Sequence, residues 1–333
     1  MLATRSSNTF HLDHAWFDCW SNAFGPVIRE EGLTLVEGRE RFGPLRIASI
    51  RSATNPHSVH YDVAPDAELA DDLPTRLFAS HDAAMLRFDY LAEDAALLAV
   101  ARRWSAYYRV RITRHALAPV VDCRGDYDRW FGARSKRIRQ RLRAGRKEAF
   151  GTLGMTVEFR SDDPTVTDLF DRMLTVEQSG WKGREGTAIR NHCDELRFYT
   201  QLVREAAVAG ALHVALLWHG DRLAAFEFGV RGERRLFLLK VSYDETYADI
   251  SVGYLLAAEH IRHCISNPTI DWYDKMGNGM SPAEYKLRFA DRCDPLYRVT
   301  VYAPGARGAL MHAHDVLRAR AKAWRDARRQ TAA

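Results

Sequence analysis

The sequence predicts an α/β protein with a mixed β-sheet flanked by helices. Apolar runs of strand length alternate with segments of helical periodicity along residues 155–303. The expected order is β-α-α-β-β-β-α-β-α-β, with strands at 155–160, 212–217, 223–230, 236–243, 269–273 and 296–303. Between the second and third of these strands, His219-Gly220-Asp221 is a strong signal for a hairpin turn. Because this hairpin and a further strand run into a helix, we expect antiparallel and parallel pairs in one sheet.

Residues 1–133 have the same mixed character and are expected to form an N-terminal domain. Strands are predicted at 32–36, 45–51, 86–90 and 108–115, and helices at 66–79 and 94–107, the first of them interrupted by Pro74. A basic linker helix is expected at 134–150, where eight of the fourteen residues 134–147 are Lys or Arg. The remaining segments are a C-terminal domain at 151–305 and a basic helical tail at 306–333.

Composition narrows the class of protein. The chain has 333 residues, a formal net charge of +5 and 47% hydrophobic residues, which suits a soluble protein with two domains. Five scattered cysteines without a Cys-x-x-Cys pair suggest reduced thiols and a cytoplasmic protein. Residues 1–10 lack the apolar core of a signal peptide, and the sequence has no apolar run long enough to span a membrane.

The most informative joint follows the strand at 236–243. Ser251-Val252-Gly253 opens a helix there, after a polar turn at 244–250. The first N–H groups of a helix lack partners within the helix and carry the positive end of its dipole. This joint therefore predicts an anion site suited to a pyrophosphate. The alternative is an ordinary helix N-cap, which Ser favours in any case.

The order of elements and their joints resemble the GNAT superfamily of acyltransferases. A closer resemblance is to the GNAT subfamily associated with cellulose and exopolysaccharide biosynthesis, similar in plan to the Fem-type peptidyl transferases. The motifs that carry it run from Ser135-Lys136-Arg137-Ile138 and Glu177-Gln178-Ser179-Gly180-Trp181-Lys182 through Gly186-Thr187-Ala188, Lys240-Val241-Ser242-Tyr243-Asp244-Glu245, Ser251-Val252-Gly253 and Asp271-Trp272-Tyr273-Asp274 to Tyr285-Lys286, with Asn55-Pro56-His57-Ser58 in the N-terminal half. The resemblance covers roughly residues 10–303.

The resemblance implies two GNAT-like halves, each a mixed, mostly antiparallel sheet flanked by helices, with an interdomain cleft. It also implies acetyl-CoA or another acyl-CoA as co-substrate, held by Ser251, Val252 and Gly253 together with Tyr243 and Asp244. The acyl group would pass directly to an amine or hydroxyl, because no Cys or Ser lies in an obviously activated setting.

Two neighbouring residues are the first catalytic candidates. By analogy with GNAT enzymes, Tyr285 would be the acid for a departing thiolate. Lys286 matches the Lys of a Phe-Lys pair in Fem-type enzymes, which implies contact with an oxyanion or a phosphate. The structural alternative is a core tyrosine beside a surface lysine.

Two acidic side chains are candidates for the general base. Asp271 and Asp274 lie at the end of a strand, and because their spacing places them on opposite faces, only one can point into a cleft; we prefer Asp274. Glu227 lies between Phe226 and Phe228 on a central strand, where burial would raise its pKa toward neutrality. Each carboxylate could instead be part of a structural ion pair.

The acceptor is expected near Glu177 and Trp181, which would share a helix face if the helix extends that far, with Lys182 and Lys240 as further substrate-binding residues. The alternative is a core tryptophan and a surface glutamate. The expected partners are an acyl-CoA and a small-molecule or sugar acceptor. The sequence indicates neither the acceptor nor the oligomeric state.

Two other functions stay open. The pyrophosphate loop of the family is reduced here to Ser251-Val252-Gly253, which is compatible with an aminoacyl-tRNA donor of the Fem type, and the basic helix could contact tRNA phosphates. A non-catalytic binding module for exopolysaccharide assembly is the third class. No metal site is expected, because His11, His14, His192, Cys193 and Asp194 lack a matching second pair of ligands.

Overall fold

The structure is a computed structural model that describes residues 7–161 and 165–331. It consists of two compact units. The first comprises Met1–Pro26 and Ala116–Asp294, and the second comprises Val27–His115 and Pro295–Ala333. The division into segments 1–133, 134–150, 151–305 and 306–333 stays a prediction.

The sheet of the first unit is mixed, as expected. Its strand order is β5-β10-β9-β8-β7-β6, where β5 is Arg109–Asp122, β10 Trp272–Asp274, β9 Arg235–Tyr243, β8 Arg222–Gly232, β7 Leu212–His219 and β6 Thr156–Ser161. All pairs in this order are antiparallel except β9 with β10, which is parallel. The hairpin of β7 and β8 turns at Gly220, whose φ of 55° suits a residue without a Cβ.

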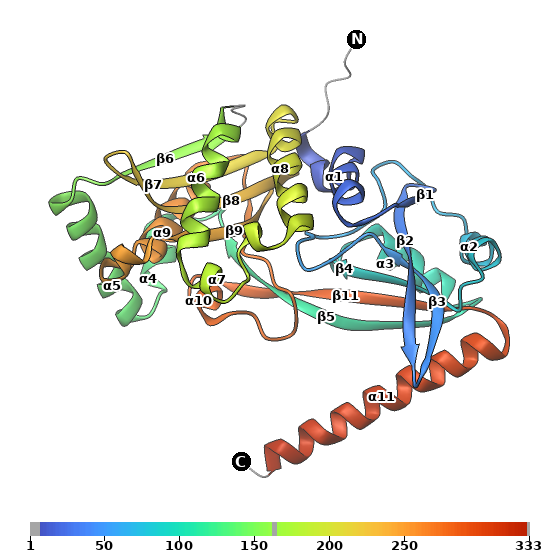
Figure 1. The fold of residues 1–333 in the computed structure, drawn as a ribbon. Helices are drawn as coiled ribbons and strands as arrows, with labels where there is room; N and C mark the ends of the chain where they lie inside the picture. The colour runs from blue at the N-terminus through green and yellow to red at the C-terminus, as the bar shows by residue number, and fades with distance from the viewer. Residues whose placement is uncertain (1–6, 162–164, 332–333) are drawn as a thin grey trace. The chain divides into compact units, whose positions relative to one another are not determined.

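Helices cover both faces of this sheet (Figure 1). On one face, α6 (Val166–Ser179) and α8 (Cys193–Val208) pack beside α1 (His14–Phe24), and the ring of Phe228 on β8 contacts Phe170 and Tyr199. On the other face, α9 (Val252–Ser266) contacts α4 (Tyr127–Gly132) and α5 (Lys136–Arg146). Because side chains alternate across a strand, Glu227 points toward α9 while Phe228 points toward α6 and α8.

The basic segment forms α5, but the helix changes type before it ends. After Arg146 the chain continues as a π-helix at Lys147–Thr152. Ile138 and Leu142 are buried against α9 residues, as the narrow apolar stripe predicts. A Cβ on Gly145 would lie 2.7 Å from the carbonyl oxygen of Ile250, so this helix passes close to the turn before α9.

The second unit contains strands in the order β1-β2-β3-β4-β11, and their directions are also mixed. Its strands are β1 (Ile28–Glu30), β2 (Leu33–Phe42), β3 (Leu45–Ser52), β4 (Met85–Leu91) and β11 (Arg292–Tyr302), and only β3 with β4 is parallel. The helices are α2 (Leu73–His81) and α3 (Ala96–Trp104). The helix expected at 66–79 begins only at Leu73, because Pro74 fits the first turn, where its missing N–H is not needed.

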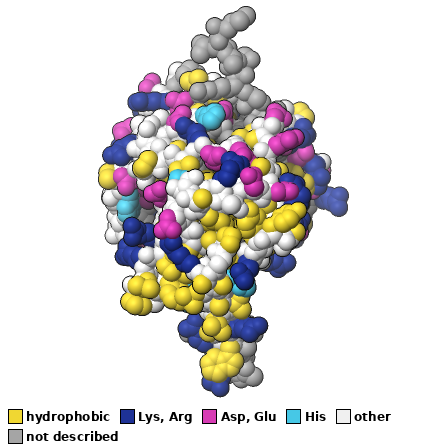
Figure 2. Space-filling model, turned by 90° about the vertical axis from the view of Figure 1, so that its right-hand side faces the viewer, with side chains coloured by type: hydrophobic (Ala, Val, Ile, Leu, Met, Phe, Trp, Pro, Cys, Tyr) yellow, Lys and Arg dark blue, Asp and Glu magenta, His cyan; other side chains and the backbone are white. Residues whose placement is uncertain are grey.

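The chain ends in the long helix α11 (Gly305–Thr331). Leu310, Leu317 and Trp324 lie seven residues apart on it and are exposed. Figure 2 shows hydrophobic and basic side chains side by side on this helix, at the bottom of the view. Among the described residues, no helix combines the length and apolar character needed to cross a bilayer.

Candidate active site

A pocket opens in the first unit where β9 continues beyond its short neighbour β10. Trp272–Asp274 pair with residues 235–237 of β9, so within the described chain the rest of β9 has a strand partner only in β8. The pocket has a volume of about 240 Å³ and is lined mainly by apolar surface. It is lined by Val241, Ser242 and Tyr243 of β9, by residues of α9, and by Trp181, Lys182, Glu227, Lys275, Tyr285 and Phe289.

The first turn of α9 lies at this pocket. Gly253 and Tyr254 line it, and the N–H groups of Tyr254 and Leu255 donate to the carbonyl oxygen of Ser251. The amides of Val252 and Gly253 come before this hydrogen-bond ladder begins. A Cβ on Gly253 would lie 3.1 Å from Cδ1 of Tyr243, so the absence of a side chain lets the helix backbone approach the ring.

Ser251 occupies the N-cap position of α9, but not in the conformation that lets a serine side chain cap a helix. It adopts a left-handed conformation with φ of 57°, and its side chain caps no amide of α9. Val252, another predicted donor-binding residue, is fully buried, so its side chain belongs to the core. The side chain that does cap is Asp244, which accepts from the N–H of Thr246 at the start of the 3₁₀ helix Glu245–Ile250.

Asp244 lies apart from the apolar pocket. It lines a second, more open depression together with Arg172, Thr175 and Arg222. Its Oδ2 lies 2.5 Å from the guanidinium of Arg222. Burial opposes the charge, but the bonds from Thr246 and Arg222 lower the pKa of Asp244. The structure therefore brings Tyr243 and Gly253 together but not Asp244 with them.

A buried carboxylate and a buried ammonium lie at the inner end of the pocket. Oε2 of Glu227 is 2.7 Å from Nδ1 of His260 and accepts from the hydroxyl of Tyr273 at 2.8 Å. Its Oε1 lies 3.5 Å from Nζ of Lys275, and both side chains are almost completely buried. The carboxylate therefore has three partners, from α9, from β10 and from the residue that follows β10.

The pKa expected for Glu227 is wrong in direction. Burial alone would raise it, but the charge of Lys275 and the bonds from His260 and Tyr273 outweigh burial and lower the pKa to about 2. At neutral pH this carboxylate is a fixed negative charge and a poor proton acceptor. Its position in the pocket agrees with the prediction, whereas its expected role as a base does not fit this pKa.

Lys275 is the charged residue that sequence reasoning missed. Its Nζ has no hydrogen-bond partner within the described residues and lies over the rings of Tyr273 and Phe289, at 4.7 and 5.5 Å from their centroids. An unsatisfied buried ammonium is costly, so a cation of this kind facing a pocket marks a place for a polar ligand atom. The sequence signal for this residue is a lysine immediately after a strand, next to Asp274.

Asp274, the preferred acid, does not reach the pocket. It is fully buried, lies 2.9 Å from the guanidinium of Arg235 and accepts from the N–H of Met276 at 2.8 Å. Asp271, on the other face, is paired with Arg234. Both aspartates therefore form ion pairs with arginines that follow β8.

Tyr285 and Lys286 lie on the short helix α10 (Glu284–Leu287). Tyr285 lines the pocket and is 41% exposed, while burial of its hydroxyl and the charge of Glu227 raise its pKa to about 12. Lys286 donates to the carbonyl oxygen of Met276 at 2.9 Å.

Lys286 is surrounded by charges of both signs. Burial and the neighbouring charge of Lys275 lower its pKa to about 8; Lys182 acts in the same direction, while Asp274 and Glu227 oppose it. Lys286 can therefore change protonation near neutrality, whereas the phenol of Tyr285 stays protonated.

The expected helix face of Glu177 and Trp181 is wrong. The helix α6 ends at Ser179, Gly180 is extended, and Trp181 begins the separate short helix α7 (Trp181–Arg184). Trp181 lines the pocket and is 44% exposed. Glu177 is buried instead, and it accepts from the N–H of Ile189 and from Nζ of Lys182 at 2.9 Å each.

The two predicted substrate-binding lysines differ in their surroundings. Lys182 lines the pocket and donates to the carbonyl oxygen of Val241 at 2.7 Å. Lys240 lies outside it, over the ring of Tyr199 and 3.4 Å from Glu195. Of the predicted acceptor residues, Trp181 and Lys182 therefore share the pocket with Tyr285 and Glu227.

Comparison with known proteins gives a match for the part of the chain that contributes most of this pocket. Residues 134–287 match the family model described as the acetyltransferase (GNAT) domain. No protein of curated function matches the chain.

Three solved structures share the fold. The C-terminal domain of a lysylphosphatidylglycerol synthetase from Agrobacterium fabrum is 14% identical, with a TM-score of 0.56 over 92% of this chain and 91% of that one. A conserved protein of unknown function from Bacteroides thetaiotaomicron is 10% identical, with a TM-score of 0.57 over 90% and 95%. FemX is 9% identical, with a TM-score of 0.55 over 87% and 94%. Residues 134–287 are therefore similar to the GNAT acetyltransferase domain, and the chain shares its fold with FemX.

Proposed function

We propose that the protein is an acyltransferase that moves an acyl group from an acyl-CoA thioester directly onto an amine or hydroxyl. One observation carries the proposal: the first turn of α9 and the unsatisfied ammonium of Lys275 face the same apolar pocket. A helix N-terminus suits the phosphates of coenzyme A, and an apolar pocket suits its thioester arm.

The open part of β9 supports the same donor. Residues of β9 beyond Phe237 lack a strand neighbour on the β10 side within the described chain, and the pocket lies along them. An exposed strand edge pairs readily with an extended chain that carries amide groups. Coenzyme A has such amides in its arm, so it can lie along β9 while its phosphates reach Gly253.

The chemistry of transfer is assigned to residues that line the pocket. The acceptor attacks the thioester carbon, its C–N or C–O bond forms, and the C–S bond breaks. Tyr285, which keeps its proton at neutral pH, donates that proton to the departing sulfur, and the proton lost from the attacking N–H or O–H returns to the Tyr285 phenolate through solvent. The ammonium of Lys275 stabilises the oxyanion, with Lys286 on the adjoining helix α10 as a second cation. Glu227 holds Lys275 as a cation and does not remove the acceptor's proton, because its pKa is about 2.

The acceptor is proposed to bind beside Trp181. This ring is partly exposed and offers an apolar surface for a sugar or another small molecule, as the sequence resemblance to the exopolysaccharide-associated subfamily suggests. A small-molecule acceptor fits the pocket volume of about 240 Å³.

The test is a thermal-shift series with acetyl-, malonyl- and long-chain acyl-CoA, followed by measurement of free thiol release with candidate amines and sugars. A ligand that binds the folded state raises the melting temperature by mass action. We expect a rise with at least one acyl-CoA and none with free pantothenate. No shift with any acyl-CoA at millimolar concentration would refute the proposal.

A second candidate is an aminoacyl-tRNA-dependent ligase. The fold likeness to FemX and the basic helix α5 favour it. Such an activity would be lost after ribonuclease treatment, whereas thiol release from an acyl-CoA would be unaffected. Loss of turnover on ribonuclease treatment would therefore decide for the ligase. A non-catalytic module would bind a ligand without turning it over. Single replacements of Tyr285 and Lys286 would then change ligand affinity but have no effect on turnover.

A further inference from the structure

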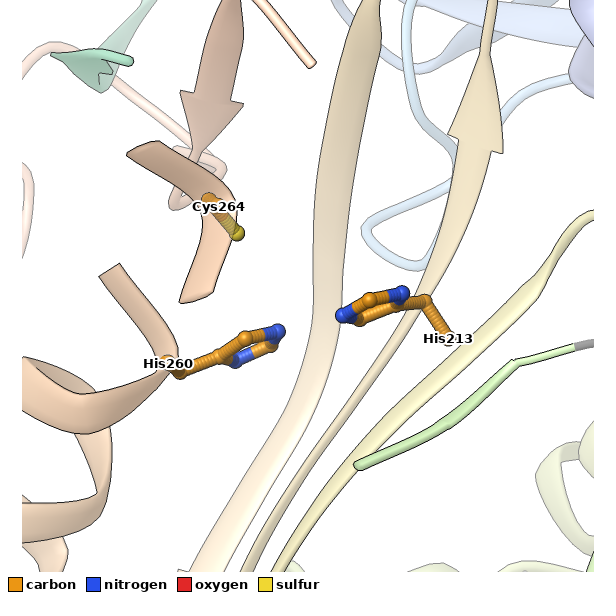
Figure 3. Close-up of side chains that lie close together, drawn as sticks. All are labelled: His213, His260 and Cys264. Atoms are coloured by element: carbon orange, nitrogen blue, oxygen red, sulfur yellow. The ribbon is translucent and has the colours of Figure 1, made fainter. Parts of the chain in front are cut away.

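Three potential metal ligands meet in the core of the first unit, behind the pocket. His213 comes from β7, while His260 and Cys264 lie one turn apart on α9. Their ligand atoms all lie within 4.8 Å of one another, and all three side chains are buried. Figure 3 shows ring nitrogens of the two histidines facing each other, with the sulfur of Cys264 nearby on the same helix.

The ring nitrogens of this cluster lack hydrogen-bond partners. Within the described residues, neither nitrogen of His213 has one, and Nε2 of His260 has none. Buried polar atoms in folded proteins are nearly always satisfied, and one that is not costs about 1–3 kcal/mol. An unsatisfied nitrogen on each of two neighbouring imidazoles, close to a thiol, therefore indicates a missing partner that accepts electron pairs.

The orientation of His260 is fixed from its other side. Its Nδ1 lies 2.7 Å from Oε2 of Glu227, a carboxylate oxygen that accepts a hydrogen bond. The N–H of this imidazole is therefore at Nδ1, which leaves the lone pair of Nε2 directed at the cluster. A carboxylate that holds a histidine in this way is the usual outer support of a metal-ligating imidazole.

We propose that His213, His260 and Cys264 form a binding site for a divalent metal ion of borderline softness, of which Zn²⁺ is the representative. Two imidazoles and one thiolate are a donor set that suits this class of ion. Zinc–nitrogen and zinc–sulfur bonds of about 2.0–2.3 Å place tetrahedral ligands roughly 3.5 Å apart, so ligand atoms that now lie within 4.8 Å of one another must approach by up to about 1.3 Å. On binding, the thiol of Cys264 loses its proton to solvent and a metal–sulfur bond forms.

Neighbouring residues suit the bound state. Binding of a divalent ion with loss of the thiol proton adds one positive charge to the core. The carboxylate of Glu227, next to His260, lies close enough to offset this charge. Cys123 belongs to the same hydrophobic cluster as Cys264 and its thiol interacts with that of Cys264, which makes it a candidate for the fourth ligand. His263 stacks on Phe159 at 4.0 Å and lies outside the ligand set.

The test uses the purified full chain. After dialysis against a chelator, Co²⁺ is titrated as a spectroscopic substitute, and the zinc content of protein before dialysis is measured by mass spectrometry. We expect one metal ion per chain, a thiolate-to-cobalt charge-transfer band, and displacement of Co²⁺ by Zn²⁺. A wild-type chain that gives no such band at micromolar Co²⁺ would overturn the proposal without any variant.

Variants locate the site. Cys264→Ser should abolish the charge-transfer band, and His213→Gln should weaken Co²⁺ binding by more than about 100-fold. Cys193→Ser, at an exposed thiol, and His263→Gln are matched controls that should keep both the band and the affinity. Circular dichroism checks that each variant is folded. A band that persists in Cys264→Ser, or that disappears in Cys193→Ser, would place the metal elsewhere and refute the assignment.

Discussion

The buried pair of Lys275 and Glu227 gives the sharpest test of the pocket. Replacing Lys275 by Met removes a cation that lies 3.5 Å from the carboxylate and leaves the shape of the side chain nearly unchanged. Breaking a buried ion pair by removing one partner typically costs about 3–5 kcal/mol, because the other charge stays buried. Glu227 keeps its bonds to His260 and Tyr273, so we expect the lower end, about 3 kcal/mol.

The reverse variant, Glu227→Gln, should cost more. It keeps the size of the side chain but leaves Lys275 with no counter-charge, and Nζ of Lys275 has no hydrogen bond within the described residues to compensate. The double variant removes both charges, so it should be more stable than the sum of the single losses predicts. A coupling free energy of at least about 2 kcal/mol is expected for groups in contact.

The assay is thermal unfolding followed by circular dichroism at pH 7, with urea unfolding as a second measure. For a chain of this size, a loss of 3 kcal/mol corresponds to a fall in melting temperature of roughly 6 °C. The control is Lys240→Met, at a lysine that pairs with Glu195 near the surface of another region. Single variants that each lower stability by under about 0.5 kcal/mol, or whose effects simply add, would show that the pair is not formed.

Three further predictions concern the proposed transfer. Tyr285→Phe should lower kcat by about 100-fold with little change in KM, because it removes a proton donor and keeps the ring; an unchanged kcat in steady-state assays would refute its role. Lys286 is a cation below its pKa of about 8 and neutral above it, so KM for acyl-CoA should rise as the pH passes 8, and Lys286→Met should abolish this step; an identical pH profile in the variant would argue against a phosphate or oxyanion contact. Gly253→Ala puts a methyl 3.1 Å from Tyr243 and should raise the Kd for acyl-CoA about tenfold by calorimetry, whereas Gly279→Ala, with open space around its Cβ, should not; equal effects would place the donor elsewhere.

The order of elements was predictable because it depends on local patterns. The strand-length apolar runs and the hairpin turn at Gly220 each act within about ten residues, and the strands β6 to β9 lie where those patterns place them. The helix α1 was missed, although Asp13 accepts from the N–H of His14 as an N-cap does. It begins with His14, Ala15, Trp16 and Phe17, which do not stand out as a helical pattern.

The chemistry of the site was less predictable, because it depends on which residues meet across the sheet. Asp274 and Lys275 are adjacent in sequence, yet the first is enclosed by Arg235 and the second faces the pocket. The sequence does not indicate which of the two faces the pocket, because this depends on how the chain leaves the end of β10. The sign of the pKa shift at Glu227 likewise follows from Lys275 and His260, which lie 48 and 33 residues away along the chain.

The glycine-rich loop after β10 shows the same limit. A Cβ on Gly277 would lie only 1.8 Å from the carbonyl oxygen of Leu117, on β5. The N–H of Leu117 also donates to Gly279 across the same approach. Glycine is required at position 277 because two backbone segments pack closely there. These segments are far apart in the sequence, so the requirement cannot be inferred from local patterns.

Glu227 connects the two sites that the structure suggests. One oxygen of its carboxylate faces Lys275 at the pocket, and the other holds His260 in the metal-ligand cluster. A metal ion on Nε2 of His260 would draw electron density from the imidazole and strengthen the bond from Nδ1–H to Glu227. The carboxylate would then stabilise the ammonium of Lys275 less, so the charge available to a ligand in the pocket depends on whether the cluster is occupied. Metal removal should therefore change the affinity for an anionic donor even though no metal ligand lines the pocket, and this change should vanish in Glu227→Gln.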